Sequence, residues 1–218
     1  MFGISPGFLS SLVYTLLGVT WNNLDATAGW SYFDGDKRIT TTSSTWQKIR
    51  AHGPRGSGKW YWEVYQTSYG NGGNIGYTCF TANSSDFFGQ VSDATKVNFY
   101  ISAHVNSNGA GNGVLTGPTG TMPAGFTSGN NRTFGFAIDY EAGKVWIASN
   151  NTWYNSGNPA TGVNPTWTFN AIDMVNNPGC PGVSYLGNFG GGANVTLRVT
   201  TPDLIYTPPQ GFLPWSGI

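Results

Sequence analysis

Charge, histidine and cysteine are all scarce in this sequence, and each shortage argues against a class of function. Charged side chains make up 9% of the 218 residues, where about a quarter is usual for soluble globular proteins. The formal net charge is zero, so nothing favours electrostatic capture of nucleic acid or of an anionic membrane. His52 and His104 stand far apart with no cysteine near either, whereas a zinc site needs roughly three or four such ligands. We therefore expect no metal, no cofactor and no nucleic acid.

Motifs for catalysis are missing as well. The chain has no Gly-x-Ser-x-Gly elbow, and the glycine run at 187–192 lacks the Lys-Ser/Thr ending of a phosphate-binding loop. No local motif pairs two of the ten acidic residues, as glycoside hydrolysis requires. Asp139 begins a predicted turn, where Asp commonly binds backbone N–H groups. Glu63 is expected to be solvated or to pair across a hairpin. The sequence therefore predicts a protein that is not an enzyme.

The two cysteines leave the redox environment open. Cys79 stands in an apolar run and is predicted to be a buried strand residue, since free cysteine is among the most buried residue types. The second cysteine, Cys180, has Pro and Gly neighbours that predict a turn. A disulfide between them is one interpretation, and two separate thiols are the simpler one.

Long hydrophobic runs are also absent, except near the N-terminus, where residues 1–18 carry no charge. The segment lacks the basic start and small-residue cleavage site of a signal peptide, and it is shorter than the roughly 20 apolar residues of a membrane helix. Apolar residues spaced by three and four predict a short amphipathic helix. Two roles stay open, packing on the chain's own domain or anchoring in another subunit. We favour the anchor, formed by Phe2, Phe8, Leu9, Leu12, Val13, Leu16 and Leu17.

Glycine, proline and aromatic residues are what the chain has in plenty. With 32 Gly, 12 Pro and 15% aromatic residues, we expect many turns, short strands and an aromatic core. No long helical pattern follows Val19, which indicates one antiparallel β-sandwich domain over residues 19–218. The predicted strands are 19–21, 30–33, 38–41, 46–51, 59–65, 73–80, 96–105, 134–140, 144–149, 180–185, 194–199 and 204–206, with long loops at 106–131 and 150–170.

Residue alternation assigns faces to two of these strands. In strand 59–65, one face is predicted to hold Trp60, Trp62 and Val64 and the other Tyr61, Glu63 and Tyr65. In strand 46–51, Lys48 and Arg50 share a face that we expect to be solvated. Strands 134–140 and 144–149 flank a short connection with one glycine, which predicts a hairpin. The predicted core aromatics are Trp60, Trp62, Phe134, Phe136 and Trp146.

Three separated blocks of the sequence resemble the SPRY family, most closely the SPRY domains of bacteriophage proteins. The first block is Thr20-Trp21-Asn22 together with residues 46–50 and 57–64. The second runs from Phe134 to Thr161, and the third is Tyr206-Thr207-Pro208-Pro209-Gln210-Gly211-Phe212. The resemblance implies a concanavalin-like jelly-roll sandwich that binds other molecules through loops at one end.

The resemblance also implies a structural or interaction protein of a bacteriophage virion. The sandwich would decorate a capsid or tail, held by residues 1–18, with other virion proteins and copies of itself as partners. The alternative is a receptor- or glycan-binding module of a phage fibre, whose partner is a bacterial surface glycan or protein. No membrane insertion is expected. The candidate binding residues, for each of which core burial is the competing interpretation, are Tyr69, Asn71, Phe87, Phe88, Trp153, Tyr154 and Trp167.

Overall fold

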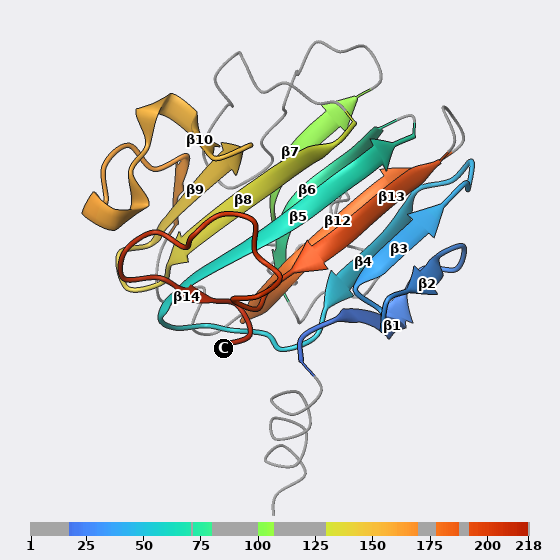
Figure 1. Cartoon of the computed structure of the whole chain (residues 1–218), viewed down its shortest axis with the longest axis horizontal. Coiled ribbons are helices and arrows are strands. Elements are labelled where there is room, and N and C mark those ends of the chain that lie inside the picture. Colours follow the sequence, from blue (N-terminus) through green and yellow to red (C-terminus); the bar gives the residue numbers. More distant parts are fainter. Residues whose placement is uncertain are drawn as a thin grey trace, which may run out of the picture.

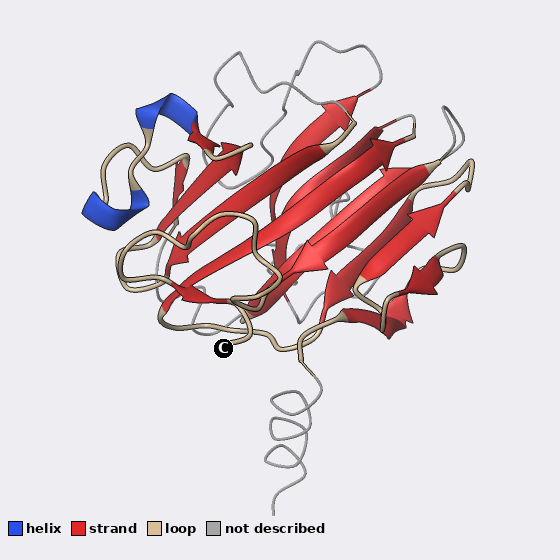
Figure 2. Ribbon diagram, viewed as in Figure 1, coloured by secondary structure: helices blue, strands red, loops and turns tan. Residues whose placement is uncertain are grey.

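The computed structural model describes residues 18–70, 72–79, 100–106, 130–169, 178–187 and 192–217. Within these ranges the chain forms two β-sheets that pack face to face (Figure 1). The helices found there are two short 3-10 turns (Figure 2), and none is long and apolar enough to cross a membrane. The predicted all-β sandwich is confirmed. The predicted anchor residues lie outside the described part of the chain.

The two sheets differ in size. Sheet A has five strands, in the order β1 (Trp21–Ala26), β4 (Gln47–Ala51), β12 (Gly179–Leu186), β6 (Gly72–Cys79) and β7 (Tyr100–Asn106). Sheet B has nine, of which seven follow the order β10 (Thr152–Trp153), β9 (Lys144–Ser149), β8 (Arg132–Asp139), β5 (Lys59–Tyr69), β13 (Ala193–Arg198), β3 (Arg38–Thr41) and β2 (Ser31–Phe33). The other two are β11 (Trp167–Thr168), which pairs with β9, and β14 (Leu213–Pro214), which pairs in parallel with β5.

The main core lies between the two sheets. The ring of Trp62 stacks on Phe136 with centroids 5.1 Å apart and meets Trp215 edge-on at 5.0 Å. Phe134 is fully buried in the same cluster. Burying each large apolar side chain stabilises the fold by roughly 1.5–3 kcal/mol. The core assignment of these predicted aromatics is confirmed, and Trp60 packs against the same cluster while half-buried.

A C-terminal strap, residues 200–217, covers part of the outward face of sheet B (Figure 1). Its strand β14 takes the place beside Trp60 and Tyr61 that β13 leaves free after Arg198. Phe212 of the strap meets Trp146 edge-on at 6.2 Å, in a second buried cluster. Trp146 is therefore buried as predicted, but beneath the strap rather than between the sheets.

The strap rules out the first of the two alternatives for Glu63, a solvated side chain. Alternation put Glu63 on the correct face, opposite Trp62, yet its side chain is fully buried. Its carboxylate accepts hydrogen bonds from the Tyr61 hydroxyl and from the backbone N–H groups of Ile205 and Tyr206, each at 2.9 Å. Residues 204–206, predicted as a strand, instead form an irregular part of the strap.

Two further predictions are wrong for a similar reason, because local sequence does not show what covers a strand. Arg50 is 4% exposed rather than solvated, and its guanidinium binds the carboxylate of Asp25 through Nε at 2.6 Å. Cys180 lies in β12 and is fully buried, not in a turn. Cys79 is the last residue of β6, as its strand prediction required.

The predicted loop at 150–170 is largely structured. It contains β10, the 3-10 turns η2 (Tyr154–Ser156) and η3 (Pro159–Thr161), and β11. Both β10 and β11 pair with β9. The indole Nε1 of Trp146 donates a hydrogen bond of 2.9 Å to the carbonyl of Val163. These contacts hold the segment 152–168 against the edge of sheet B.

Candidate binding face

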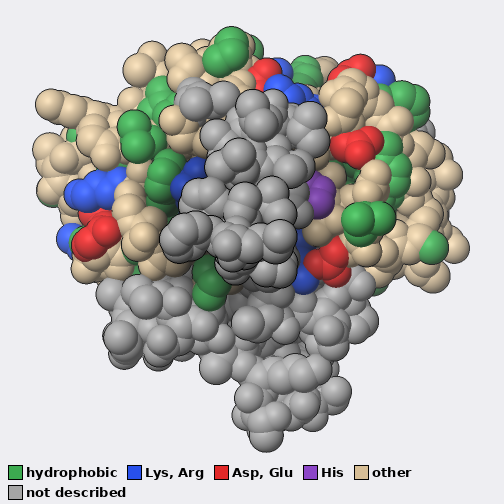
Figure 3. All heavy atoms as spheres, turned by 90° about the horizontal axis from the view of Figure 1, so that it is seen from below, with side chains coloured by type: hydrophobic (Ala, Val, Ile, Leu, Met, Phe, Trp, Pro, Cys, Tyr) green, Lys and Arg blue, Asp and Glu red, His purple; other side chains and the backbone are tan. Residues whose placement is uncertain are grey.

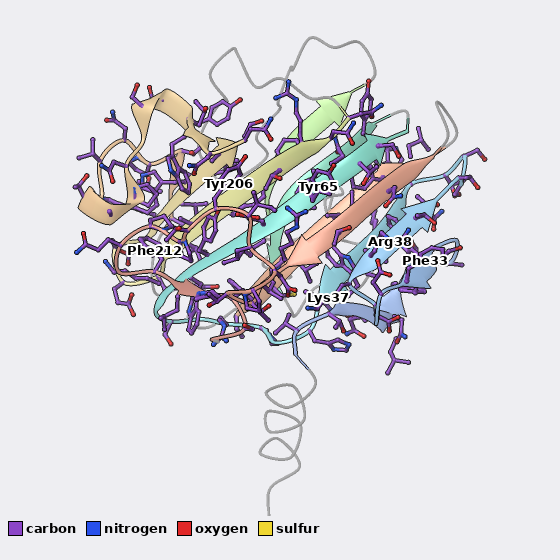
Figure 4. The ribbon with its side chains drawn as sticks, in the orientation of Figure 1. Phe33, Lys37, Arg38, Tyr65, Tyr206 and Phe212 are labelled. Carbon is purple, nitrogen blue, oxygen red and sulfur yellow. The ribbon has the colours of Figure 1, made fainter. Side chains whose placement is uncertain are left out.

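Strand register brings four outward side chains into one row across sheet B. Phe33 of β2 is paired with Arg38 of β3. Thr196 of β13 is paired with Arg38 on one side and with Tyr65 of β5 on the other. Neighbouring strands lie about 4.8 Å apart, so the row spans about 14 Å from Phe33 to Tyr65. We call these four residues the cross-strand row; Figure 4 labels three of them.

The row faces away from the core because the residues next to it along each strand face inward. Ile39, Val195 and Val64 are fully buried between the sheets. Side chains alternate between the two faces of a strand, so their neighbours point outward. Phe33 is 41% exposed, and the other three members are half-buried.

A second row, made of polar side chains, lies one step along the same strands. It pairs Ser31 with Thr40, Thr40 with Asn194, and Asn194 with Ser68. The Ser68 hydroxyl donates to the carbonyl of Gly192 at 2.7 Å. The Asn194 Oδ1 atom is buried without a hydrogen-bond partner. The face therefore combines aromatic rings with hydroxyl and amide groups.

The two aromatic rings of the cross-strand row are each covered on one side by a guanidinium. The Cζ atom of Arg38 lies 4.3 Å from the ring centroid of Phe33, and that of Arg198 lies 4.6 Å from the ring of Tyr65. Such cation–π contacts contribute about 0.5–1 kcal/mol at exposed sites. The Tyr65 hydroxyl also donates a hydrogen bond of 3.1 Å to Asn131 Oδ1. These contacts hold both rings in place before any ligand arrives.

The cations of this face are matched by nearby carboxylates. Arg38 Nε binds Asp34 Oδ2 at 2.8 Å, and a nitrogen of Arg198 lies 3.8 Å from Glu63 Oε2. Where the face borders the strap, Lys37 Nζ lies 2.5 Å from Asp203 Oδ2. Because charge is neutralised within the face, it offers little attraction to a highly charged partner.

Asp203 fixes the border between this face and the strap. Burial of its carboxyl works against ionisation, but hydrogen bonds from Lys37 and Thr200 and the charge of Lys37 outweigh it. Together they hold the pKa of Asp203 below its usual value of 3.8. Figure 4 places Lys37 below Arg38, on the side toward the strap.

The chemistry around the face is suited to binding rather than to acid–base catalysis. Glu63, its buried carboxylate, accepts three hydrogen bonds from within the protein and is fully buried, so a substrate on this face does not reach it. Burial, followed by the nearby Glu63 charge, raises the pKa of Tyr61 far above its ordinary value. Among the described residues, no three His, Cys, Asp or Glu side chains come together in a way that could hold a metal ion. Figure 3, which looks at the end where β1 and the C-terminus lie, shows acidic and basic side chains interspersed rather than gathered by sign.

The fold of this chain is similar to that of solved structures, although the sequence identity with them is low. The crystal structure of the SPRY domain of human HERC1 superposes with a TM-score of 0.56 and 14% identity, covering 86% of this chain and 99% of that domain. A TRIM65 PSpry domain gives a TM-score of 0.54 and 14% identity, covering 90% of this chain and 97% of the other. The fold is that of a SPRY domain. By sequence, neither a family model nor a curated protein matches the chain.

In this SPRY-like sandwich, the three sequence blocks that carried the resemblance occupy neighbouring places. The first supplies parts of β1, β4 and β5. The second forms the β8–β9 hairpin, in which Asp139 Oδ1 accepts a hydrogen bond of 2.9 Å from the N–H of Ala142, as its turn prediction required. The third lies within the strap, and its Phe212 packs on Trp146 of the second block. The motifs therefore mark contacts that hold the sandwich together.

Four of the predicted binding residues lie in the described part of the SPRY-like structure, and these four are not gathered on one exposed surface. Tyr69 lies at the end of β5 and packs against the main core. Trp153 packs on Tyr61 with ring centroids 6.3 Å apart, and Tyr154 packs against the main core, where burial raises its pKa. Trp167 is 4% exposed and belongs to the core, so for this residue the competing interpretation holds. The other three lie outside the described residues: Asn71, Phe87 and Phe88.

Sequence reasoning missed the cross-strand row for a clear reason. Phe33 and Arg38 lie in short segments with no distinctive motif, and Tyr65 was named only as one of an alternating set. The row exists because β2, β3, β13 and β5 are neighbours in sheet B, although β13 is far from the others in sequence. A search for outward-facing aromatics paired with arginine would have found Tyr65, but only with the strand order in hand.

Proposed function

We propose that this chain is a non-enzymatic structural and interaction protein of a bacteriophage virion, in which the SPRY-like sandwich displays a binding face and residues 1–18 attach it to the particle. The observation that carries the binding role is the cross-strand row. It places Phe33, Arg38 and Tyr65 on one outward face with both rings already held by guanidinium groups. Aromatic side chains held on an outward face offer a large contact area to a ligand.

The place where residues 18–21 join the sandwich supports attachment through the N-terminal segment. Val19 is buried against the sandwich, and the backbone of Thr20 and Trp21 is bonded to His52 and Asp36. These residues lie at the same end of the molecule as the C-terminus (Figure 1). Gly18 therefore lies at one end of the sandwich, and attachment through the segment before it would keep the outward face of sheet B available.

The phage assignment is supported by the sequence blocks that resemble phage-type SPRY domains and by the low charge of the chain. A protein that stands on a particle surface needs contact surfaces rather than a catalytic centre. The uncharged, apolar N-terminal segment fits burial in an interface with other virion proteins or with copies of this chain. Capsid and tail positions are equally compatible with these features.

Attachment can be tested by sedimenting phage particles that carry variants of the full chain. Leu12→Asp with Leu16→Asp places charge on the apolar stripe, whereas Ser10→Asp with Ser11→Asp adds the same charge beside it. We expect the serine pair to sediment with particles and the leucine pair to remain in the soluble fraction. An anchor built on the apolar stripe would be ruled out if the leucine pair sedimented with particles as well as the serine pair. It would also be ruled out if the unmodified chain and the serine pair both stayed in the soluble fraction. Light scattering of the full chain and of residues 19–218 tests in parallel whether the segment drives self-association.

A further inference from the structure

We propose that the cross-strand row and the polar row beside it bind an uncharged, hydroxyl-rich polysaccharide chain. The inference rests on the proposed display role, because it names what the displayed face would contact. It concerns the outward face over β2, β3, β13 and β5, and it uses no residue of the N-terminal segment.

Charge is the first argument for an uncharged ligand. The arginine of the row, Arg38, is already bound to Asp34 at 2.8 Å. Lys37, at the border, lies 2.5 Å from Asp203, and Arg198 lies within 3.8 Å of the buried carboxylate of Glu63. A nucleic acid, an anionic polysaccharide or an acidic peptide would have to compete with these carboxylates for each cation. A neutral ligand meets no such competition.

The polar groups are the second argument, since they offer both donors and acceptors at close spacing. Thr40 and Thr196 present hydroxyls from adjacent strands, half-buried on this face. Asn194, half-buried between Thr40 and Ser68, adds an amide group to the same row. A sugar carries hydroxyls that both donate and accept, which matches this mixture.

The aromatic rings are the third argument, and they set the size of the ligand. Phe33 and Tyr65 stand at the two ends of the row, about 14 Å apart by strand spacing. That separation exceeds a single sugar ring, so one molecule touching both must be an oligosaccharide or a longer chain. Arg38 and Arg198 each cover one face of a ring and hold it in place. The apolar face of a sugar ring would pack on the part of each aromatic ring that the guanidinium leaves uncovered.

The same features disfavour a protein as the ligand of this particular face. Protein interfaces have a core depleted in charge and rich in contiguous apolar and aromatic side chains. Here the two rings are separated by Arg38 and Thr196 in one row and bordered by Ser31, Thr40 and Asn194 in the next. Among the described residues of these two rows, polar or charged side chains separate the two rings, and no apolar side chain joins them.

The test measures binding of the full-length chain to defined oligosaccharides by isothermal titration calorimetry. The neutral probes are dextran, cellohexaose and chitohexaose, and alginate oligosaccharides are the anionic probe. We expect at least one neutral probe to bind with sub-millimolar affinity and alginate to bind at least about tenfold more weakly. Phe33→Ala and Tyr65→Ala should each weaken binding by about tenfold, as loss of one aromatic contact predicts.

The matched control is Leu24→Ala, because Leu24 is 91% exposed on β1 of the opposite sheet. It should keep the affinity of the unmodified chain within about twofold, and circular dichroism melting verifies that each variant is folded. The inference would be overturned if no neutral probe bound, or if alginate bound more tightly than the neutral probes. It would also be overturned if all three substitutions had equal effects, or if only peptides bound at this face. None of these results bears on particle sedimentation, so the proposed attachment role can survive the loss of the glycan site.

Discussion

The Oε1 atom of Glu63 accepts a hydrogen bond of 2.9 Å from the backbone N–H of Tyr206, which lies 143 residues later in the chain. Oε2 of the same carboxylate accepts another from Ile205, also at 2.9 Å. One fully buried side chain of β5 thus fastens the C-terminal strap to sheet B. The strap in turn covers Tyr61 and Trp146 and borders the cross-strand row.

Replacing this carboxylate should loosen the strap. Glu63→Gln leaves one oxygen acceptor where two backbone N–H groups and one hydroxyl now donate, so at least one buried donor loses its partner. We expect the free energy of unfolding to fall by about 2–3 kcal/mol, the range for hydrogen bonds to a buried charged group. Urea denaturation measures the change. Glu141→Gln is the control, because that exposed carboxylate binds only the N–H of Gly58 among the contacts described; a loss as large there would show that the strap contacts of Glu63 are not what matters.

Gly135 of β8 should not tolerate a side chain, because Tyr61 occupies the space. A Cβ at this position would lie 2.8 Å from the Tyr61 hydroxyl oxygen, closer than van der Waals contact allows. We expect Gly135→Ala to cost about 1–3 kcal/mol, as overpacking a buried site does. A double-mutant cycle with Tyr61→Phe isolates the cause. Alanine should cost clearly less in the background that carries Tyr61→Phe, and identical costs in both backgrounds would contradict the proposed clash.

Arg55 should be a second fastening point for the C-terminus. Its Cζ lies 3.5 Å from the ring centroid of Trp60, and its Nε donates a hydrogen bond of 2.7 Å to the carbonyl of Trp215. Burial lowers the pKa of Arg55 to about 10, so the group remains charged at neutral pH. We expect Arg55→Ala to destabilise by about 2–3 kcal/mol, combining a lost cation–π contact with a lost charged hydrogen bond. Hydrogen exchange should rise at residues 213–217; unchanged exchange there would show that Arg55 does not secure the strap.

Acid should weaken the strap through Asp203. The folded-state pKa of this carboxyl is held below its usual value of 3.8, because the contacts from Lys37 and Thr200 outweigh burial. A depressed carboxyl pKa contributes stability that is present above about pH 4 and is lost as the pH falls through the folded-state value. Asp203→Asn should therefore lower stability at neutral pH and flatten the acid dependence below about pH 4. Urea denaturation at each pH measures the free energy of unfolding of both proteins. An equal dependence on pH in the two proteins would refute this role.

Much of the sandwich could be predicted from local sequence. The predicted strands 38–41 and 144–149 coincide with β3 and β9, because turn residues bound these segments on both sides. The hairpin around Asp139 and the core positions of Trp62 and Phe136 follow from alternation and turn chemistry. Such features depend on neighbours within a few residues, so the sequence shows them directly.

The candidate face could not be predicted in the same way. Phe33, Arg38, Thr196 and Tyr65 become neighbours only through the pairing of β2, β3, β13 and β5. Strand pairing between segments more than a hundred residues apart is set by how the whole core packs. Glu63 shows the same limit, since alternation found its face but not the strap that buries it.

The sequence by itself therefore determined that this chain is all-β, nearly free of net charge, and built around an aromatic sandwich core. Local turn preferences and the two-residue period of strands are sufficient for that. Only the tertiary structure decided which polar residues are buried and which outward side chains share a face. The physical reason is that burial and register depend on which distant segment packs against a strand, as the C-terminal strap does against Glu63.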